Sequence, residues 1–150
     1  PAIDRKKGFA ETIADLPQFN VIHSLAGDFT KASGYEMMKS TLTIYGNDIH
    51  AVYAHNDDMA LGAIKAIEEY GLRPGKDILI VSIDGTEAAF DVMLAGKLNC
   101  TVECTPLLGP QLMQAVKNLM SGRQLPVRII TSEGVFPAET ARTDRLNRKY

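Results

Sequence analysis

Apolar residues recur along the chain with two different periods, which predict strands and helices in alternation. Continuous or alternating apolar runs predict strands, whereas apolar positions three or four residues apart predict amphipathic helices. Strands are expected at residues 19–26, 49–54, 77–83, 98–104 and 127–132. Helices are expected at 3–14, 30–45, 56–70, 87–95 and 107–121, each closed by a proline or glycine signal or by the next loop.

The alternation favours an α/β fold, with a doubly wound and mostly parallel sheet that carries helices on both faces. The run DILIVSI (77–83) has no polar alternation, which predicts a strand buried on both faces. The charged end, ETARTDRLNRKY, is expected to be at the surface or frayed. Because the first element is a helix rather than a strand, and the first residue is not a methionine, we expect an N-terminal part to be absent.

Composition and charge narrow the classes of function only slightly. The 150 residues suit one domain with a real core, and a hydrophobic content of 45% is ordinary. The net charge of −2 gives no electrostatic reason to expect nucleic acid as a partner. No apolar run approaches the roughly 20 residues that cross a bilayer, and no signal peptide is recognisable.

The two cysteines predict neither a disulfide nor a metal site. In one extended strand the Cα atoms of Cys100 and Cys104 are about 13 Å apart at roughly 3.3 Å per residue, which is too far for a disulfide. Two thiols without further ligands make a poor zinc site, and the three histidines lack metal-binding spacing. We therefore expect reduced thiols, no metal and no cofactor.

Polar residues follow several of the predicted strands, at the edge where open parallel sheets bind ligands. Carboxylate and amide oxygens accept hydrogen bonds from hydroxyls, a guanidinium donates to neighbouring oxygens, and an aromatic face packs on sugar C–H groups. Such a set suits a neutral polyol. The candidates are Phe29, Asn56, Asp57, Asp58, Asp84 and Cys104 at the strand ends, with Arg5 from the first helix.

Each candidate also has a structural explanation. The acidic and amide residues at 56–58 suit the cap of a helix, and Asp84 before a glycine suits a turn. Arg5 fits a solvated helix face, and Phe29 fits an ordinary core. Asp57 and Asp84 are conceivable as a carboxylate pair for glycoside hydrolysis. However, the chain contains no nucleophile elbow, phosphate loop or dinucleotide fingerprint, so we expect no enzyme.

Four motifs occur in an order that resembles a known family. They are R-x-x-G-F (5–9), YAHNDDMALGAIKAI (53–67), PGKDILIVSIDGT (74–86) and LAGKL (94–98). Together they resemble the C-terminal half of the ribose-type periplasmic sugar-binding proteins of bacterial ABC transporters. The stretches AIDRKKGFAE and AHNDDM are most similar to galactofuranose-binding members.

The resemblance implies how such a protein works. Two lobes joined by a hinge close on a monosaccharide, such as galactofuranose or galactose, and deliver it to a membrane permease in the periplasm without catalysis. In the family, the residues that match Arg5, Asn56 and Asp84 contact sugar hydroxyls, and the one that matches Phe29 stacks on the sugar. Asp57 and Asp58 would then cap the helix and support Asn56.

Two departures from the family pattern argue against ribose as the ligand. Ile83 stands where the ribose binders have a phenylalanine, and Cys104 stands where they have a glutamine near the hinge. Cys104 is therefore expected to support the site rather than to replace that glutamine.

The resemblance also implies a division of the chain. Residues 1–104 would form the C-terminal sugar-binding lobe without its first strand, 105–126 the hinge crossing and a helix of an absent N-terminal lobe, and 127–150 the return strand and tail. Such an unpartnered helix invites dimerisation or domain swapping. The alternative is the effector-binding domain of a LacI-type transcription repressor, which shares the arginine and asparagine motifs. The D-G-T and LAGKL motifs favour transport.

Overall fold

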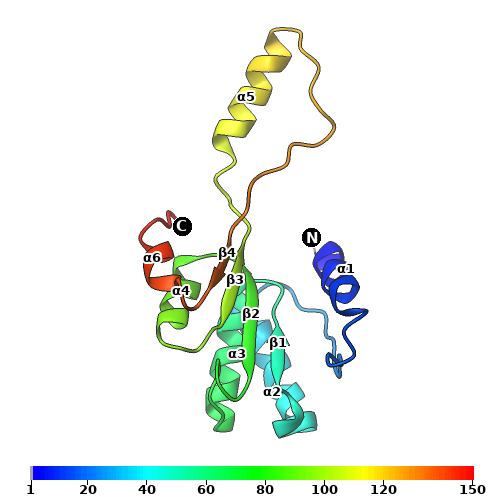
Figure 1. Ribbon diagram of the computed structural model, residues 1–150, viewed down its shortest axis with the longest axis vertical. Coiled ribbons are helices and arrows are strands. Elements are labelled where there is room, and N and C mark those ends of the chain that lie inside the picture. Colours follow the sequence, from blue (N-terminus) through cyan, green and yellow to red (C-terminus); the bar gives the residue numbers. More distant parts are fainter. Residues whose placement is uncertain (1) are drawn as a thin grey trace.

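The computed structural model describes residues 2–150, and its helices and strands alternate along the chain (Figure 1). The helices are α1 (Ala2–Ile13), α2 (Lys31–Tyr45), the 3-10 helix η1 (Gly46–Asp48), α3 (Asp57–Tyr70), α4 (Glu87–Leu94), α5 (Gly109–Met120) and α6 (Ala141–Arg145). The strands are β1 (Ala51–Tyr53), β2 (Leu79–Asp84), β3 (Cys100–Glu103) and β4 (Val135–Pro137).

The four strands form one mixed sheet in the order β1-β2-β3-β4. Strands β1, β2 and β3 are parallel, and β4 runs antiparallel to β3. The α/β fold with helices on both sides of a mostly parallel sheet is confirmed. The strand predicted at 127–132 is wrong, because pairing with β3 begins only where the Glu103 N–H donates to the Gly134 carbonyl, at 2.8 Å.

The strand predicted at residues 19–26 is also wrong. This segment is irregular, and its apolar residues Phe19, Val21, Ile22 and Leu25 are exposed. Among the described residues, β1 pairs with β2 alone, and residues 19–26 join no strand. An alternating pattern becomes a strand only where the backbone of a neighbour supplies the ladder of hydrogen bonds.

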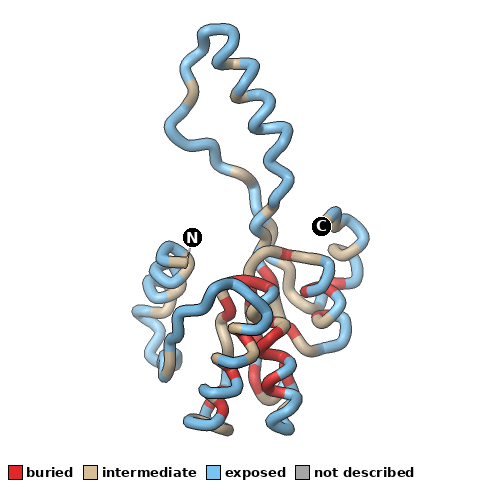
Figure 2. Tube along the Cα trace, turned by 180° about the vertical axis from the view of Figure 1, so that it is seen from behind, coloured by how far each residue is buried: buried red, intermediate tan, exposed pale blue. Residues whose placement is uncertain are grey.

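The core lies on one face of the sheet, beneath α3 and α4, with α2 packed against α3 (Figure 2). Ile80 and Ser82 of β2 are buried on this face, whereas Leu79, on the other face, is 50% exposed. On the other face α1 reaches β1 through Phe9, whose ring stacks on Tyr53 at 4.7 Å. The expectation that 77–83 is buried on both faces is therefore wrong, because α1 covers only part of the second face.

Helices α2 and α3 pack with their backbones in contact. A Cβ atom on Gly62 would lie 2.1 Å from the Lys31 carbonyl oxygen, and one on Gly34 would lie 2.3 Å from that of Met59. Only glycine permits this approach. As the sequence predicts, Thr30 caps α2 by accepting a hydrogen bond from the Ser33 N–H. This packing fixes the position of the α3 N-terminus beneath the carboxyl end of β1.

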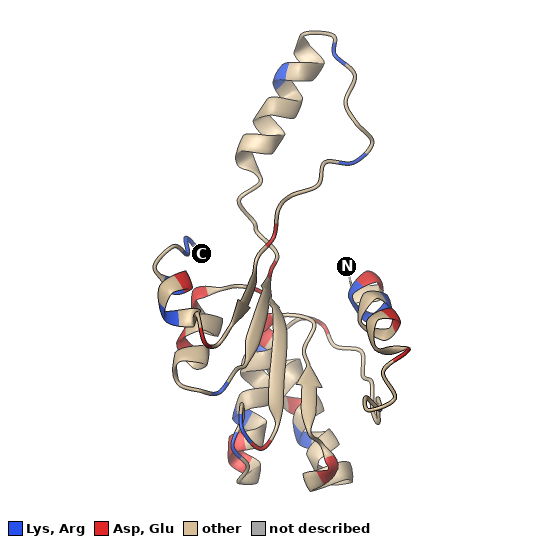
Figure 3. Ribbon diagram, viewed as in Figure 1, with Lys and Arg blue, Asp and Glu red and all other residues tan. Residues whose placement is uncertain are grey.

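Helix α5 and its flanking segments project from the sheet as an arm, which Figure 1 shows. No residue of α5 is buried, Leu112 and Leu119 are exposed, and its single charged residue is Lys117 (Figure 3). Between residues 2 and 150, no helix is both long and apolar enough to cross a membrane.

The charged tail lies mostly at the surface, as one of the two expectations has it, and it is folded rather than frayed. Residue Ala141 of α6 is fully buried, and Arg145 forms an ion pair with Asp91 of α4 at 2.7 Å. The Arg148 side chain is only 7% exposed. The charge pattern does not reveal that α4 and β3 supply carboxylate partners for Arg145 and Arg148.

Candidate functional site

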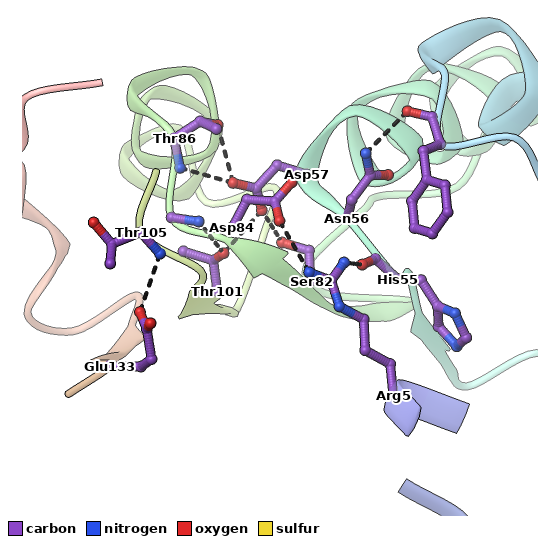
Figure 4. Close-up of polar contacts among 12 residues, drawn as sticks. Arg5, His55, Asn56, Asp57, Ser82, Asp84, Thr86, Thr101, Thr105 and Glu133 are labelled. Carbon is purple, nitrogen blue, oxygen red and sulfur yellow. Dashed lines mark hydrogen bonds and ion pairs between the residues drawn. The ribbon is translucent and has the colours of Figure 1, made fainter. Parts of the chain in front are cut away.

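The candidate site lies at the carboxyl ends of β1 and β2, where the structure brings Arg5, Asn56 and Asp84 together (Figure 4). Arg5 comes from α1, Asn56 precedes α3, and Asp84 ends β2. Asp57 lies beside them, as does the Asp84–Thr86 turn that follows β2. The topology therefore gathers these four predicted residues from three elements.

Arg5 and Asp84 form the charged centre of the site. Nη2 of Arg5 lies 3.4 Å from Oδ1 of Asp84, and their side chains are 17% and 29% exposed. Nη1 of Arg5 donates to the carbonyl oxygen of His55. Burial raises the pKa of Asp84, the negative charge of Asp57 raises it further, and Arg5 opposes both effects. Both side chains remain partly open to solvent, so hydroxyl groups of a ligand can reach them.

The backbone at Asp84 is strained and must be held in place. Its φ of 132° lies in a region that side chains other than glycine rarely adopt, and such a conformation costs of order 1–3 kcal/mol. The Cys104 N–H donates to the Asp84 carbonyl at 3.0 Å, and the Gly85 N–H donates to Oγ1 of Thr101 at 3.2 Å. Cys104 thus supports the turn through its backbone, while its thiol is free and exposed.

Asp57 is a buried residue whose side chain holds the same turn. Its carboxylate is only 1% exposed, and Oδ2 accepts hydrogen bonds from both the N–H and the hydroxyl of Thr86, at 2.8 and 2.9 Å. Oδ1 accepts from the hydroxyls of Ser82 and Thr101. Four donors therefore satisfy a carboxylate that would otherwise be costly to bury. This one side chain ties α3 to β2, β3 and the Asp84–Thr86 turn.

The capping role predicted for Asp57 and Asp58 belongs to Asn56. Oδ1 of Asn56 accepts a hydrogen bond from the Met59 N–H at 3.0 Å, and Nδ2 donates to the Phe29 carbonyl at 2.9 Å. Asp57 points into the site network, and Asp58 is exposed in the first helical turn. These two hydrogen bonds leave one lone pair and one N–H of the Asn56 amide unused, although the residue is only 8% exposed.

Phe29 lies in the loop that Asn56 fastens. Its ring is 38% exposed, and its φ of 65° is unusual for a residue with a side chain. The hydrogen bond from Asn56 to its carbonyl fixes this backbone. The alternative that Phe29 is an ordinary core residue is therefore wrong, since the structure leaves the ring available at the surface.

Sequence reasoning missed the residues that build the site from below. Ser82 interrupts an apolar strand and Thr101 lies opposite it in register, so both hydroxyls meet Asp57. Each is a single polar residue within a strand, which is a weak signal without the register. A group of three or more metal-ligating side chains suited to an ion is absent from residues 2–150.

Comparisons with known proteins identify the family that this chain matches. The model of the periplasmic binding protein domain matches residues 1–124. The galactofuranose-binding protein YtfQ of Escherichia coli K12 is 42% identical over 99% of this chain and 48% of its own length. The arabinose-transporter binding protein of Shewanella sp. ANA-3, solved with arabinofuranose, superposes with a TM-score of 0.92 at 43% identity, over 99% of this chain and 50% of that one.

A Mycobacterium smegmatis protein solved with β-D-fucofuranose gives a TM-score of 0.91 at 42% identity, over 98% of this chain and 48% of that one. The chain therefore spans about half the length of the relatives that it matches. The sugars named for these three relatives, galactofuranose, arabinofuranose and fucofuranose, all have five-membered rings.

Proposed function

Because this chain belongs to the periplasmic binding protein family, we propose that its strand-end site binds a monosaccharide in the furanose form. The observation that carries the proposal is the partly open pair of Arg5 and Asp84 beside the amide of Asn56. A carboxylate, a guanidinium and an amide in one place offer both acceptors and donors to the hydroxyls of a neutral sugar. The three relatives that bind furanoses support the choice of ring.

Each residue has a distinct part in this proposal. The Asp84 carboxylate accepts hydrogen bonds from sugar hydroxyls, and the adjacent Arg5 donates to sugar oxygens. Asn56 uses its remaining N–H and lone pair, and the exposed ring of Phe29 packs on sugar C–H groups. Asp57 holds the turn that carries Asp84. Asp58 and the Cys104 thiol make no contact with the sugar.

Delivery for import follows from the same proposal. We place this chain as the C-terminal lobe of a binding protein in the periplasm, with the arm at 105–126 belonging to the hinge and a second lobe. Closure of the two lobes would exclude water from the hydrogen bonds to the sugar and present it to an ABC permease. Both oxygens of Asp57 are engaged by four donors, so Asp57 is not free to act with Asp84 as the carboxylate pair of a glycoside hydrolase. We infer that the site binds and releases its ligand unchanged.

Titration calorimetry on the longest natural polypeptide that carries this sequence tests the proposal. D-galactose, L-arabinose and D-ribose are titrated, and NMR of galactose labelled with ¹³C at the anomeric carbon identifies the ring form that is bound. We expect binding of the furanose form, with ribose at least about tenfold weaker, a difference that corresponds to about 1.4 kcal/mol. If none of the sugars binds, or if only the pyranose form does, the proposal is wrong.

Arg5→Met and its matched control, Arg73→Met, locate the site. Arg73 pairs with Asp77 just before β2, at the other end of that strand from Asp84. Removal of a charged hydrogen-bond donor to the ligand is expected to weaken binding by about a hundredfold, equivalent to about 2.7 kcal/mol. The control should stay within about twofold. Equal effects of the two variants would place the sugar elsewhere.

A further inference from the structure

Residues 148–150 pack against the strands that lead into the arm. Nη1 of Arg148 donates to Oε1 of Glu103 at 2.8 Å, and the Tyr150 hydroxyl donates to the same oxygen at 2.8 Å. Oε2 of Glu103 accepts a hydrogen bond from the Gly134 N–H at 3.0 Å. Glu103 ends β3, where the chain enters the arm, and Gly134 precedes β4, where the chain leaves the arm. The Glu103 carboxylate therefore contacts both of these crossing segments and the tail.

The Arg148 guanidinium is enclosed to a degree that is unusual for a cation. It lies 4.9 Å from the ring centroid of Phe136, 5.6 Å from that of Phe90 and 4.4 Å from that of Tyr150. Within the described residues, Nε and Nη2 are buried and have no hydrogen-bond partner. Burial of a charge is costly, and aromatic faces and one carboxylate offset only part of that cost.

The carboxylate of Glu103 is a strong acceptor for these donors. Burial would raise the pKa of Glu103, but the hydrogen bonds from Tyr150, Arg148 and Gly134 outweigh this effect and hold the pKa below its usual value. Glu103 thus stays ionised and matched to the Arg148 cation at neutral pH. The contact persists under the conditions in which a periplasmic protein works.

The same tail contacts the strained Asp84–Thr86 turn at Gly85 and at the residue that follows the turn, Glu87. A Cβ atom on Gly85 would lie 3.0 Å from Nη2 of Arg148, which shows how closely the guanidinium backs the turn. The N–H of Glu87, directly after the turn, donates to the Tyr150 carbonyl at 2.9 Å. Asp84 is also the register partner of Glu103 on the neighbouring strand. The turn is therefore braced from behind by the tail and from the side by β3.

We propose that Arg148 and Tyr150, acting on Glu103, form a clasp that fixes the Asp84 carboxylate in the orientation needed for sugar binding. The same clasp holds the two crossings of the arm at one position relative to the site. The inference rests on the proposed sugar-binding function. Arg148 is a positioning residue: it acts through Glu103 and the turn, whereas Asp84 makes the contact with the sugar.

Sugar affinity of Arg148→Met tests the positioning role, with Arg145→Met as the matched control. Both substitutions remove an arginine from the same tail, but Arg145 pairs with Asp91 on the outer surface of α4. We expect Arg148→Met to weaken binding about tenfold or more, because the turn that carries Asp84 loses the guanidinium that backs it at Gly85. Arg148→Lys should restore part of the affinity, and Arg145→Met should stay within about twofold.

Two further variants keep the test decisive. Tyr150→Phe removes only the hydroxyl, so it tests the clasp even if Arg148→Met unfolds, and about a threefold loss of affinity is expected. Arg148→Met combined with Glu103→Gln should lose less affinity than the product of the two single losses, because the residues act as one unit. If the affinity loss of the double variant equals the product of the two single losses, the residues act independently and the clasp is contradicted.

Amide hydrogen exchange without sugar examines the clasp separately. In Arg148→Met the amides of Glu87 and Gly134 should exchange about tenfold faster, while that of Ile80, in the core of the sheet, is unchanged. Unchanged exchange at both sites would show that no clasp exists. Faster exchange with unaltered affinity would show a clasp that does not position Asp84, and the inference would fall while sugar binding stands. If the unaltered protein binds no sugar, the proposed function fails and the positioning role fails with it.

Discussion

Asp57→Asn is the substitution that most directly tests how the site is built. The Asp57 carboxylate accepts four hydrogen bonds, two from Thr86 and one each from the hydroxyls of Ser82 and Thr101. The best placement of an asparagine keeps its oxygen opposite Thr86 and turns its NH2 toward the two hydroxyls, which can rotate to accept. All four contacts then survive, but as hydrogen bonds between neutral groups.

The expected magnitude follows from the loss of charge. A hydrogen bond to a charged group contributes about 1.5–3 kcal/mol, and one between neutral groups about 0.5–1.5 kcal/mol. Four bonds that each lose about 1 kcal/mol give a loss of about 4 kcal/mol. The lower cost of burying a neutral amide offsets part of this loss. We expect the free energy of unfolding to fall by about 2–3 kcal/mol.

Urea unfolding at pH 7 measures this difference, and Asp58→Asn is the matched control. Asp58 is the next residue and is exposed in the first turn of α3, where its charge interacts only with the helix N-terminus. Its loss should cost about 0.5 kcal/mol. If the two substitutions cost the same, Asp57 does not hold the Asp84–Thr86 turn, and the account of the site given above is refuted.

The remaining two predictions concern helix packing and pH. Gly62→Ala should lower the free energy of unfolding by about 3 kcal/mol, because its Cβ would lie 2.1 Å from the Lys31 carbonyl oxygen. By contrast, Gly8→Ala, in open space on α1, should raise the free energy of unfolding by up to about 1 kcal/mol. Urea unfolding measures both variants. If the two substitutions have similar effects, the close packing of α2 on α3 is contradicted. Burial raises the pKa of Asp84, so its contribution to stability is full below its unfolded value near 3.8 and is lost as the pH rises through its folded value. The stability of Asp84→Asn relative to the unaltered protein should therefore increase from pH 4 to pH 7 in urea titrations, and a difference independent of pH would show that Asp84 is not destabilised by its surroundings.

The periodic parts of the chain could be predicted because local rules decide them. Helix α3 has apolar residues at helical spacing between a polar cap and Gly71, and β2 is apolar from Leu79 to Ile83 except at Ser82. The order of elements then implied parallel strands with a ligand edge at their carboxyl ends. That reasoning predicts that Asn56 and Asp84 lie near one another, and the structure adds Arg5 from α1 to them.

The errors arise where a strand needs a particular neighbour. Residues 19–26 and 127–132 carry strand-like patterns, yet neither enters the sheet. The tail, expected from its charge to be at the surface or frayed, is mostly at the surface but is held by Arg148, whose guanidinium lies against three aromatic rings. Pairing and burial of these segments depend on distant partners, which no local period describes.

The sequence by itself thus determined the α/β order, the ends of the main helices and the residue types gathered at the strand ends, since each follows from periods of a few residues. Only the tertiary structure decided that Asn56 caps α3 while Asp57 is buried beneath the turn. The two residues are adjacent and alike in polarity, so propensity cannot separate them. Their roles differ because the α3 N-terminus meets Ser82, Thr86 and Thr101 on one side only, and that meeting is made by the register of β2 and β3.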